Sequence, residues 1–296
     1  MPEAAGLSIR RRYFLEPHEV ALITLGVGTT LALLLATSPS NSAFIEVSVA
    51  STLYGLVVAW PATRKRFQIP FLASYAFVVW FYMAVARITP ALGTTLRDAT
   101  LLTIDGAMFG QTPAIFCERV ARAWFTDAMS ICYLTYHLYL FMAVAYAALA
   151  PHSAHKRLSA YLFTGFAIGF AGYLFVPAIG PAYAFPGLFK DPLPGGFPTR
   201  LISELVTAGS SRYDTFPSLH VLITCILLDH DFRHVRRRFW IMIIPSLGLM
   251  ISTVYLRYHY AIDLLAAFLL FVALRTTFLK GERREVTLPQ RTQETS

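Results

Sequence analysis

Long apolar runs recur along the 296-residue chain, separated by short polar stretches. A helix needs about 20 mostly apolar residues to cross the hydrocarbon core of a bilayer. Eight runs approach or exceed that length, at about 17–37, 44–61, 68–89, 124–149, 158–179, 216–231, 238–256 and 259–279. The pattern predicts an all-α, multi-pass membrane helix bundle. An alternative for the first run is a signal segment cleaved after SPSNSA, although RRRYFLEPHE is an atypical lead-in for one.

The charged residues predict how this bundle is oriented. Only 14% of the chain is charged while 56% is hydrophobic, so each cluster of charge carries information. Most of the 25 basic residues fall in alternate connecting segments, at 10–12, 64–66, 156–157, 233–238 and from 275 onward. Basic residues concentrate on the cytoplasmic side of membrane proteins. We therefore expect both termini to be cytoplasmic in a bacterial inner membrane. The net charge of +8 then reflects topology, and no nucleic-acid partner is expected.

Two segments on the opposite, extracytoplasmic side are long enough to carry function. The first, at about 90–123, contains TTLRDATLLTIDGAMFG, whose spaced apolar residues predict an interfacial amphipathic helix ending at Gly110. The second, at about 180–215, is rich in proline and glycine and predicts a cap or lid over the site. Residues 280–296 are polar and predict a disordered cytoplasmic tail.

The stretch YHYAID places His259 and Asp263 four residues apart, on one face of a helix. The carboxylate could accept the imidazole Nδ1–H, which leaves Nε2 free as a nucleophile or base. Alone, a pair of this kind is as compatible with a structural role, in which it only ties a helix end.

The stretch YDTFPSLHV precedes another apolar run. Asp214 or Thr215 could cap a helix with Pro217 in its first turn, which leaves free amides that attract an anion such as phosphate. Ser218 would add a hydroxyl and His220 a proton donor. A capped helix with an incidental histidine is the alternative. Both histidine stretches are predicted at the same membrane level, where ionisable residues are usually functional, and together they suit in-line displacement at phosphorus.

These stretches resemble the signatures of a known family. FPSLHV followed by STVYLRYHYAIDLL is similar to the second and third signatures of the type 2 phosphatidic acid phosphatase (PAP2) superfamily. The PSLH form resembles the branch that contains inositol phosphorylceramide synthase. YLFVPAIGPAYAF, at 173–185, resembles a degenerate first signature. The resemblance implies a six-helix PAP2-type catalytic core at 68–279, preceded by two extra transmembrane helices within 1–67 and followed by the tail at 280–296.

The resemblance also implies roles for individual residues. His259 would be the nucleophile that forms a phosphohistidine, and Asp263 would orient it. His220 would be the general acid for the departing alcohol, and Ser218 would bind phosphate. Neither a metal nor a cofactor is implied, and the expected partners are membrane lipids and a phospholipid or other lipid-phosphate substrate.

The chain departs from the family at three cationic positions. Tyr173 and Gly180 stand where the first signature has a lysine and an arginine, and Thr253 stands where the third has an arginine. Phosphoryl transfer needs preorganised donors for its developing charge. Arg257 and Arg212 are the candidate replacements in this sequence, with the interfacial Arg97 a further one.

Other polar residues have several possible roles. Tyr183 could bind substrate through its hydroxyl, and Asp127 and His137 could line the site or pair structurally. Asp105 is expected to cap or orient its own segment. A non-catalytic lipid or anion transporter that uses the same residues remains an alternative function, and the loss of cations favours it. Against it, the sequence lacks an evident inverted repeat. Hydrolysis and headgroup transfer are both compatible with the signatures.

Overall fold

The computed structural model describes residues 15–149 and 152–287, and every regular element among them is helical. The all-α prediction is therefore confirmed. The long helices are α1 (Pro17–Ala36), α2 (Ser42–Ala59), α3 (Gln68–Ala91), α6 (Ala123–Leu149), α7 (His152–Phe175), α10 (Leu219–His234), α11 (Arg236–Tyr255) and α12 (Ala261–Thr287). The short ones are η1 (Thr63–Lys65), α4 (Asp98–Phe109), α5 (Pro113–Arg119), α8 (Pro181–Ala184), η2 (Pro186–Leu188) and α9 (Phe197–Gly209).

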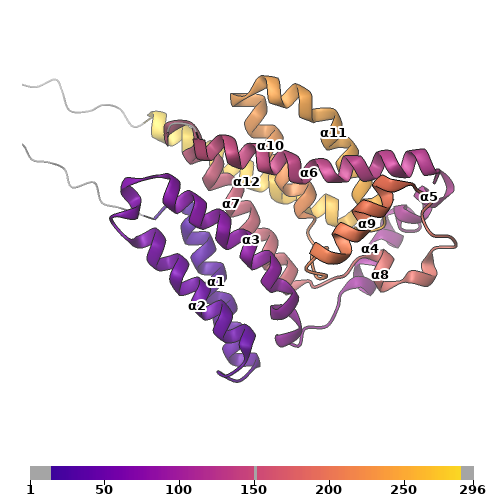
Figure 1. Ribbon diagram of the computed structural model, residues 1–296, viewed down its shortest axis with the longest axis horizontal. Helices are drawn as coiled ribbons and strands as arrows, with labels where there is room; N and C mark the ends of the chain where they lie inside the picture. The colour runs from indigo at the N-terminus through magenta and orange to yellow at the C-terminus, as the bar shows by residue number, and fades with distance from the viewer. Residues whose placement is uncertain (1–14, 150–151, 288–296) are drawn as a thin grey trace, which may run out of the picture.

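A long helix coincides with each of the eight predicted spans, but α10 is shorter than a typical span. Among the described residues, seven helices are long and apolar enough to cross a membrane, and they support an integral multi-pass membrane protein. Helix α10 has 16 residues, most of them buried against other helices. Its apolar residues therefore contact protein rather than lipid. The start of α1 and the end of α12 lie at the same end of the bundle (Figure 1), which fits an even number of crossings with α10 included.

Helix α10 is the centre of the molecule. It packs against α6, α7, α11 and α12, while α1 packs on α7 and α2 packs on α1 and α3. The two N-terminal helices thus add to one edge of the bundle (Figure 1). Helix α12 continues to Thr287, beyond the predicted start of a disordered tail at 280. Residues 288–296 and the predicted basic cluster at 10–12 lie outside the described residues.

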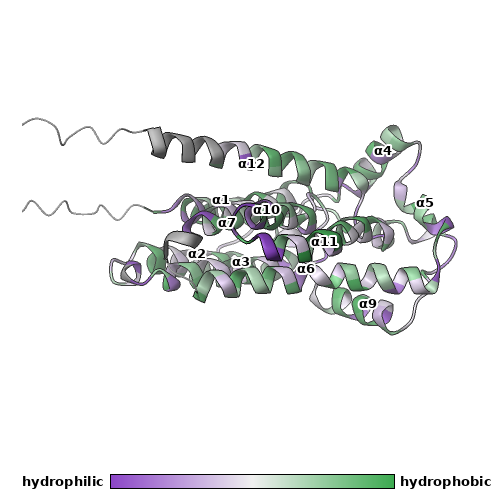
Figure 2. Cartoon of the chain, turned by 90° about the horizontal axis from the view of Figure 1, so that it is seen from above, coloured by the Kyte–Doolittle hydropathy of each residue, from purple (hydrophilic) through white to green (hydrophobic). Residues whose placement is uncertain are grey.

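The long helices consist mostly of hydrophobic residues, and hydrophilic residues concentrate toward helix ends and loops (Figure 2). Leu35 is 88% exposed, Ile244 71% and Phe141 65%. Large exposed apolar surfaces mark contact with lipid or another partner. The distribution is what a helix bundle requires when lipid surrounds it.

The short helices α4, α5, α8 and α9 gather at the end of the bundle away from the start of α1 (Figure 1). Helix α4 ends at Gly110, whose φ of 81° is a backbone conformation that glycine adopts readily. The predicted helix end at this glycine is confirmed. The predicted lid contains α8 and α9, and α9 packs on α6. These elements surround the end of the bundle where both signature histidines lie.

Candidate active site

The turn between α11 and α12 presents His259. The carbonyl oxygen of Thr253 accepts hydrogen bonds from the backbone N–H groups of Tyr258 and His259, both at 3.1 Å. Arg257 reverses the chain with a φ of 67°, in the left-handed region. His259 is consequently held just before the first residue of α12 and is only 2% exposed.

His259 lies between a carboxylate and a hydroxyl. Its Nδ1 is 3.3 Å from Asp263 Oδ2, and its Nε2 is 3.4 Å from Ser218 Oγ. Asp263 Oδ2 also accepts the backbone N–H of Tyr260 at 2.8 Å, which fixes the carboxylate at the start of α12. The predicted contact is present, but His259 precedes α12 and does not share a helical face with Asp263. With the proton on Nδ1 donated to Asp263, the lone pair of His259 is on Nε2.

The start of α10 differs from the prediction. The helix begins at Leu219 with Ser218 as its N-cap, so Pro217 precedes the helix, and Asp214 and Thr215 do not cap it. The backbone N–H of Ser218 donates to the carbonyl oxygen of Asp263 at 3.2 Å. The prediction of a free amide at Ser218 is wrong, because this N–H group donates its hydrogen bond to a carbonyl oxygen in the first turn of α12.

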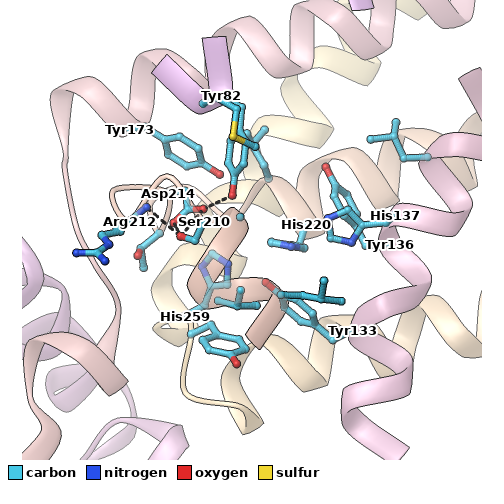
Figure 3. Close-up of a pocket in the computed structure, with 18 of the residues that line it drawn as sticks. Tyr82, Tyr133, Tyr136, His137, Tyr173, Ser210, Arg212, Asp214, His220 and His259 are labelled. Carbon is cyan, nitrogen blue, oxygen red and sulfur yellow. Dashed lines mark hydrogen bonds between the residues drawn. The ribbon is translucent and has the colours of Figure 1, made fainter. Parts of the chain in front are cut away.

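His220 lies in the first turn of α10 and faces the same space as His259 (Figure 3). The two ring centroids are 5.6 Å apart. The rings of Tyr133 and Tyr136 lie at 4.7 Å and 4.6 Å from His220, so aromatic side chains of α6 hold the imidazole in place. Among the described residues, none forms a hydrogen bond with the buried Nδ1 of His220. No protein partner in the described part of the chain therefore fixes the position of the proton on the His220 ring.

A cavity of about 790 Å³ connects these residues, between α3, α6, α7 and α9. Its volume is within the usual range for small-molecule sites. His137, His220 and His259 line it, whereas Ser218 and Asp263 lie behind its wall. The tyrosines that line the cavity are Tyr75, Tyr82, Tyr133, Tyr136, Tyr173, Tyr183 and Tyr258. The two histidines of the signatures therefore open onto one largely aromatic and apolar space.

The predicted replacement cations are not brought to the histidines. Arg257 donates to the carbonyl of Asp191 at 2.9 Å and to Glu118 Oε1 at 3.2 Å, and it stacks on Phe189 at 4.1 Å. These contacts tie the loop after η2 to α5 and direct the guanidinium away from the cavity. Burial lowers the pKa of Arg257 from its ordinary value, and nearby Glu118 opposes that shift. The structure thus gives Arg257 a structural role.

Arg212 belongs to the cavity lining, but its exposed side chain extends away from His220 and His259 (Figure 3). Arg97 is exposed at the start of α4. Tyr183, predicted to bind substrate, lines the cavity and is 51% exposed. Of the predicted binding side chains, Tyr183 is therefore the one best placed for a substrate inside the cavity.

The three positions that lack the family's cations have roles of their own. Tyr173 lines the cavity and is 1% exposed. Gly180 has a φ of 86°, and a Cβ there would collide with the carbonyl oxygen of Tyr258. Thr253 is fully buried and donates to Met250 O at 2.8 Å. No longer side chain fits at 180 without moving the turn that carries His259.

Two buried aspartates of α4 hold the site together. Asp98 accepts hydrogen bonds from the backbone N–H of Gly180 at 2.9 Å and from the Tyr260 hydroxyl at 2.9 Å. Asp105 accepts the backbone N–H groups of Ala261 and Ile262 at 3.0 Å and 2.9 Å. Asp105 was expected to cap its own segment but instead caps α12. Asp98 was not predicted, and its place in the first turn of an amphipathic helix was the one available signal.

Asp127 and His137 do not form a pair. Asp127 Oδ1 accepts the backbone N–H of Gly196 at 2.8 Å and the Thr199 hydroxyl at 2.6 Å, which fixes the start of α9. His137 lines the cavity next to Tyr136. Among the described residues, no cluster of three or more histidine, cysteine or acidic side chains has the arrangement of a metal site.

A comparison with protein families matches residues 99–276 to the family described as the PAP2 superfamily. The match begins in α4, after the N-terminal helices, and includes all of the residues that line the cavity from α6 to α12. It does not distinguish a branch within the superfamily. Neither the curated proteins nor the solved structures compared with the chain gave a match.

Proposed function

Because this chain belongs to the PAP2 superfamily, we propose that it is an integral membrane phosphatase or phosphotransferase that acts on a lipid-linked phosphoester through a phosphohistidine. One observation carries the proposal: His259, oriented by Asp263, and His220 open onto one cavity with their rings 5.6 Å apart. This separation leaves room for a phosphoryl group between an attacking nitrogen and a proton donor.

In the first step, His259 Nε2 attacks phosphorus and the bond to the leaving oxygen breaks. Protonated His220 transfers its proton to that oxygen, so the lipid alcohol departs neutral. Asp263 accepts the Nδ1–H of His259 throughout and stabilises the positive charge that the ring acquires. Ser218 contacts Nε2 from behind the cavity wall, at 3.4 Å, so it positions the ring before attack.

In the second step, an acceptor hydroxyl attacks the phosphohistidine and the N–P bond breaks. His220, now neutral, takes the acceptor's proton and is ready for the next cycle. If the acceptor is water, the protein is a phosphatase. If it is a lipid or other alcohol, the protein is a phosphotransferase, which is the outcome that the PSLH form of the second signature favours.

The distribution of arginines supports an active site on the extracytoplasmic side of a bacterial inner membrane. Arg64 and Lys156 form ion pairs with Glu19 and Glu16 at the start of α1. Arg233 and Arg275 both pair with Asp229, near the end of α10 that is opposite His220. The histidines lie toward the other end. The substrate would then be a lipid whose headgroup reaches the outer leaflet.

The test is turnover by purified protein in detergent, measured as lipid alcohol released and as phosphate or headgroup product. We expect His259→Ala to abolish turnover, because the covalent step has no nucleophile. A matched change at the cavity wall, His137→Ala, removes an imidazole outside the signatures and should keep turnover within the same order of magnitude. Full turnover by His259→Ala would reject the phosphohistidine route.

Among the described residues, Arg212 is the one arginine or lysine that lines the cavity, and it extends away from the histidines. This favours a second candidate, a transporter that binds lipid phosphate without cleaving it. Reconstitution in vesicles separates the two functions. A transporter would move a labelled phospholipid between leaflets with its phosphoester intact, in the wild type and in His259→Ala alike. The proposed enzyme would release product and lose that activity in the variant.

A further inference from the structure

The charge lining the cavity is unusual for a site that handles phosphate. Among the described lining residues, Asp214 is the one carboxylate and Arg212 the one guanidinium, and the latter extends away from the histidines (Figure 3). Tyr173, Gly180 and Thr253 stand where cations bind phosphate in the family. A phosphomonoester, which carries up to two negative charges, would find a carboxylate on the wall and no lysine or arginine facing it. The cavity is therefore better matched to a headgroup whose own positive charge offsets its phosphate.

Asp214 is the group that such a positive charge would meet. Its carboxylate accepts a hydrogen bond from the Tyr82 hydroxyl at 2.5 Å and from Ser210 Oγ at 3.0 Å. Both donors are neutral, and no ion pair to Asp214 occurs among the described residues. A half-buried carboxylate in apolar surroundings is costly unless a cation pairs with it. The two hydroxyls thus fix the carboxylate in place and leave its charge for a ligand.

Tyrosine side chains share the cavity with this carboxylate. Tyr82 donates a hydrogen bond to Asp214, and Tyr133 and Tyr173 line the same cavity. Faces of tyrosine rings attract ammonium groups, and the attraction grows when water is excluded. In Figure 3, Tyr82, Tyr173 and Asp214 lie above His259, and His220 lies to its right.

We propose that Asp214 and the tyrosines around it form a subsite for the ammonium group of a zwitterionic phosphodiester, such as a phospholipid with an ethanolamine-type headgroup. This proposal rests on the proposed function, since the phosphodiester must reach His259. The phosphate of such a lipid carries one negative charge, so the headgroup is neutral overall. The ligand's own ammonium, held by Asp214, then offsets the phosphate charge that the family offsets with three cations.

The chemistry balances for this donor. His259 Nε2 forms a bond to phosphorus while the bond from phosphorus to the diacylglycerol oxygen breaks, and His220 protonates that oxygen. The phospho-headgroup stays on His259 with its ammonium on Asp214. The acceptor hydroxyl then forms a new bond to phosphorus, the N–P bond breaks, and the acceptor's proton returns to His220. No oxidant, reductant or further reactant enters.

Binding measured without turnover tests the subsite separately from catalysis. In the His259→Ala background, we would titrate dihexanoyl phosphatidylethanolamine and dihexanoyl phosphatidylglycerol, which have the same acyl chains but differ in the ammonium. Adding Asp214→Asn should weaken binding of the ethanolamine lipid roughly 10- to 100-fold, the range for losing a charged hydrogen-bond partner. The same change should leave the affinity for the glycerol lipid within about twofold of its value before the change. Glu204→Gln removes one exposed negative charge from α9 and should change neither affinity.

The outcomes separate the two proposals. Equal losses for both lipids, or no preference for the ethanolamine lipid before Asp214 is changed, would overturn the subsite. If the Asp214→Asn variant fails to fold, the relative affinity of the His259→Ala protein for the two lipids decides whether the subsite exists. Ammonium-dependent binding together with no turnover of either lipid by the wild type would support the subsite and reject the enzyme. Turnover of both lipids at equal rates, without any preference in binding for the ammonium, would support the enzyme and reject the subsite.

Discussion

Asp105→Asn is the change that most directly tests how α4 positions the histidine. Asp105 is fully buried and accepts three hydrogen bonds: from the Thr112 hydroxyl at 2.7 Å and from the N–H groups of Ala261 and Ile262 at 3.0 Å and 2.9 Å. The last two begin α12, two and three residues after His259. Removing the carboxylate therefore acts on the start of α12, next to His259.

The hydrogen-bond geometry sets the size of the effect. An asparagine has one acceptor oxygen and one NH₂ group, so it can satisfy only one side of the pair formed by Ala261 and Ile262. The other backbone N–H then faces a donor. Losing a hydrogen bond to a charged group costs about 1.5–3 kcal/mol, and weakening an N-cap costs about 1 kcal/mol. We expect a loss of about 2–4 kcal/mol in the free energy of unfolding, on these principles.

Activity should fall further than stability alone would cause. A shift of the α12 start moves His259 relative to His220, and small misplacements of reacting groups cost about 100-fold in rate. Thermal unfolding in detergent and release of lipid alcohol are the two measurements. Thr112→Val removes one donor to Asp105 but leaves both α12 contacts, so it should lower stability slightly and largely retain activity.

Asp191→Asn is the control, because it removes a carboxylate from an exposed part of the loop after η2. The reasoning is refuted if Asp105→Asn has the melting temperature and turnover of this control. A loss of stability with unchanged turnover would show that Asp105 supports the fold but does not position His259.

Two further changes test the turn that holds His259. Gly180→Ala should lower stability by about 1–2 kcal/mol from the left-handed backbone alone, and by more because its Cβ meets the carbonyl of Tyr258; an unchanged melting temperature would contradict this. Arg257→Gln should destabilise the protein by about 1–3 kcal/mol through loss of the Glu118 contact, while KM for the donor stays nearly constant. A rise in KM of about tenfold or more would instead restore Arg257 as a phosphate ligand.

The predictions that succeeded rest on local regularities. A span requires a long apolar run wherever it occurs, so the helices of the bundle follow from the sequence alone. The contact between His259 and Asp263 joins residues only four apart in the chain, although His259 precedes α12 and does not share a helical face with Asp263. Gly110 ends α4 because its positive φ suits glycine. Each of these depends only on residues close together in the chain.

The predictions that failed concern contacts between distant segments. Ser218, and not Asp214, is the N-cap of α10. Its backbone N–H donates a hydrogen bond to the carbonyl oxygen of Asp263, which is 45 residues later in the chain. Arg257 is adjacent to the third signature in sequence, but its guanidinium is held by Glu118, which is 139 residues away. The role of Asp98 depends on contacts with the turn after α7 and with the start of α12. Such pairings are set by how the helices pack, which no local pattern specifies.

The most direct measurement for the proposed function is the covalent state of His259 during turnover. The protein would be mixed with a ³²P-labelled phospholipid, stopped in alkali, where phosphohistidine survives, and digested for mass spectrometry. We predict a label that acid removes, located on the peptide that contains His259 and absent from His259→Ala. Product formation by the wild type, with no label on that peptide at any stopping time in either the wild type or His220→Ala, would contradict the account.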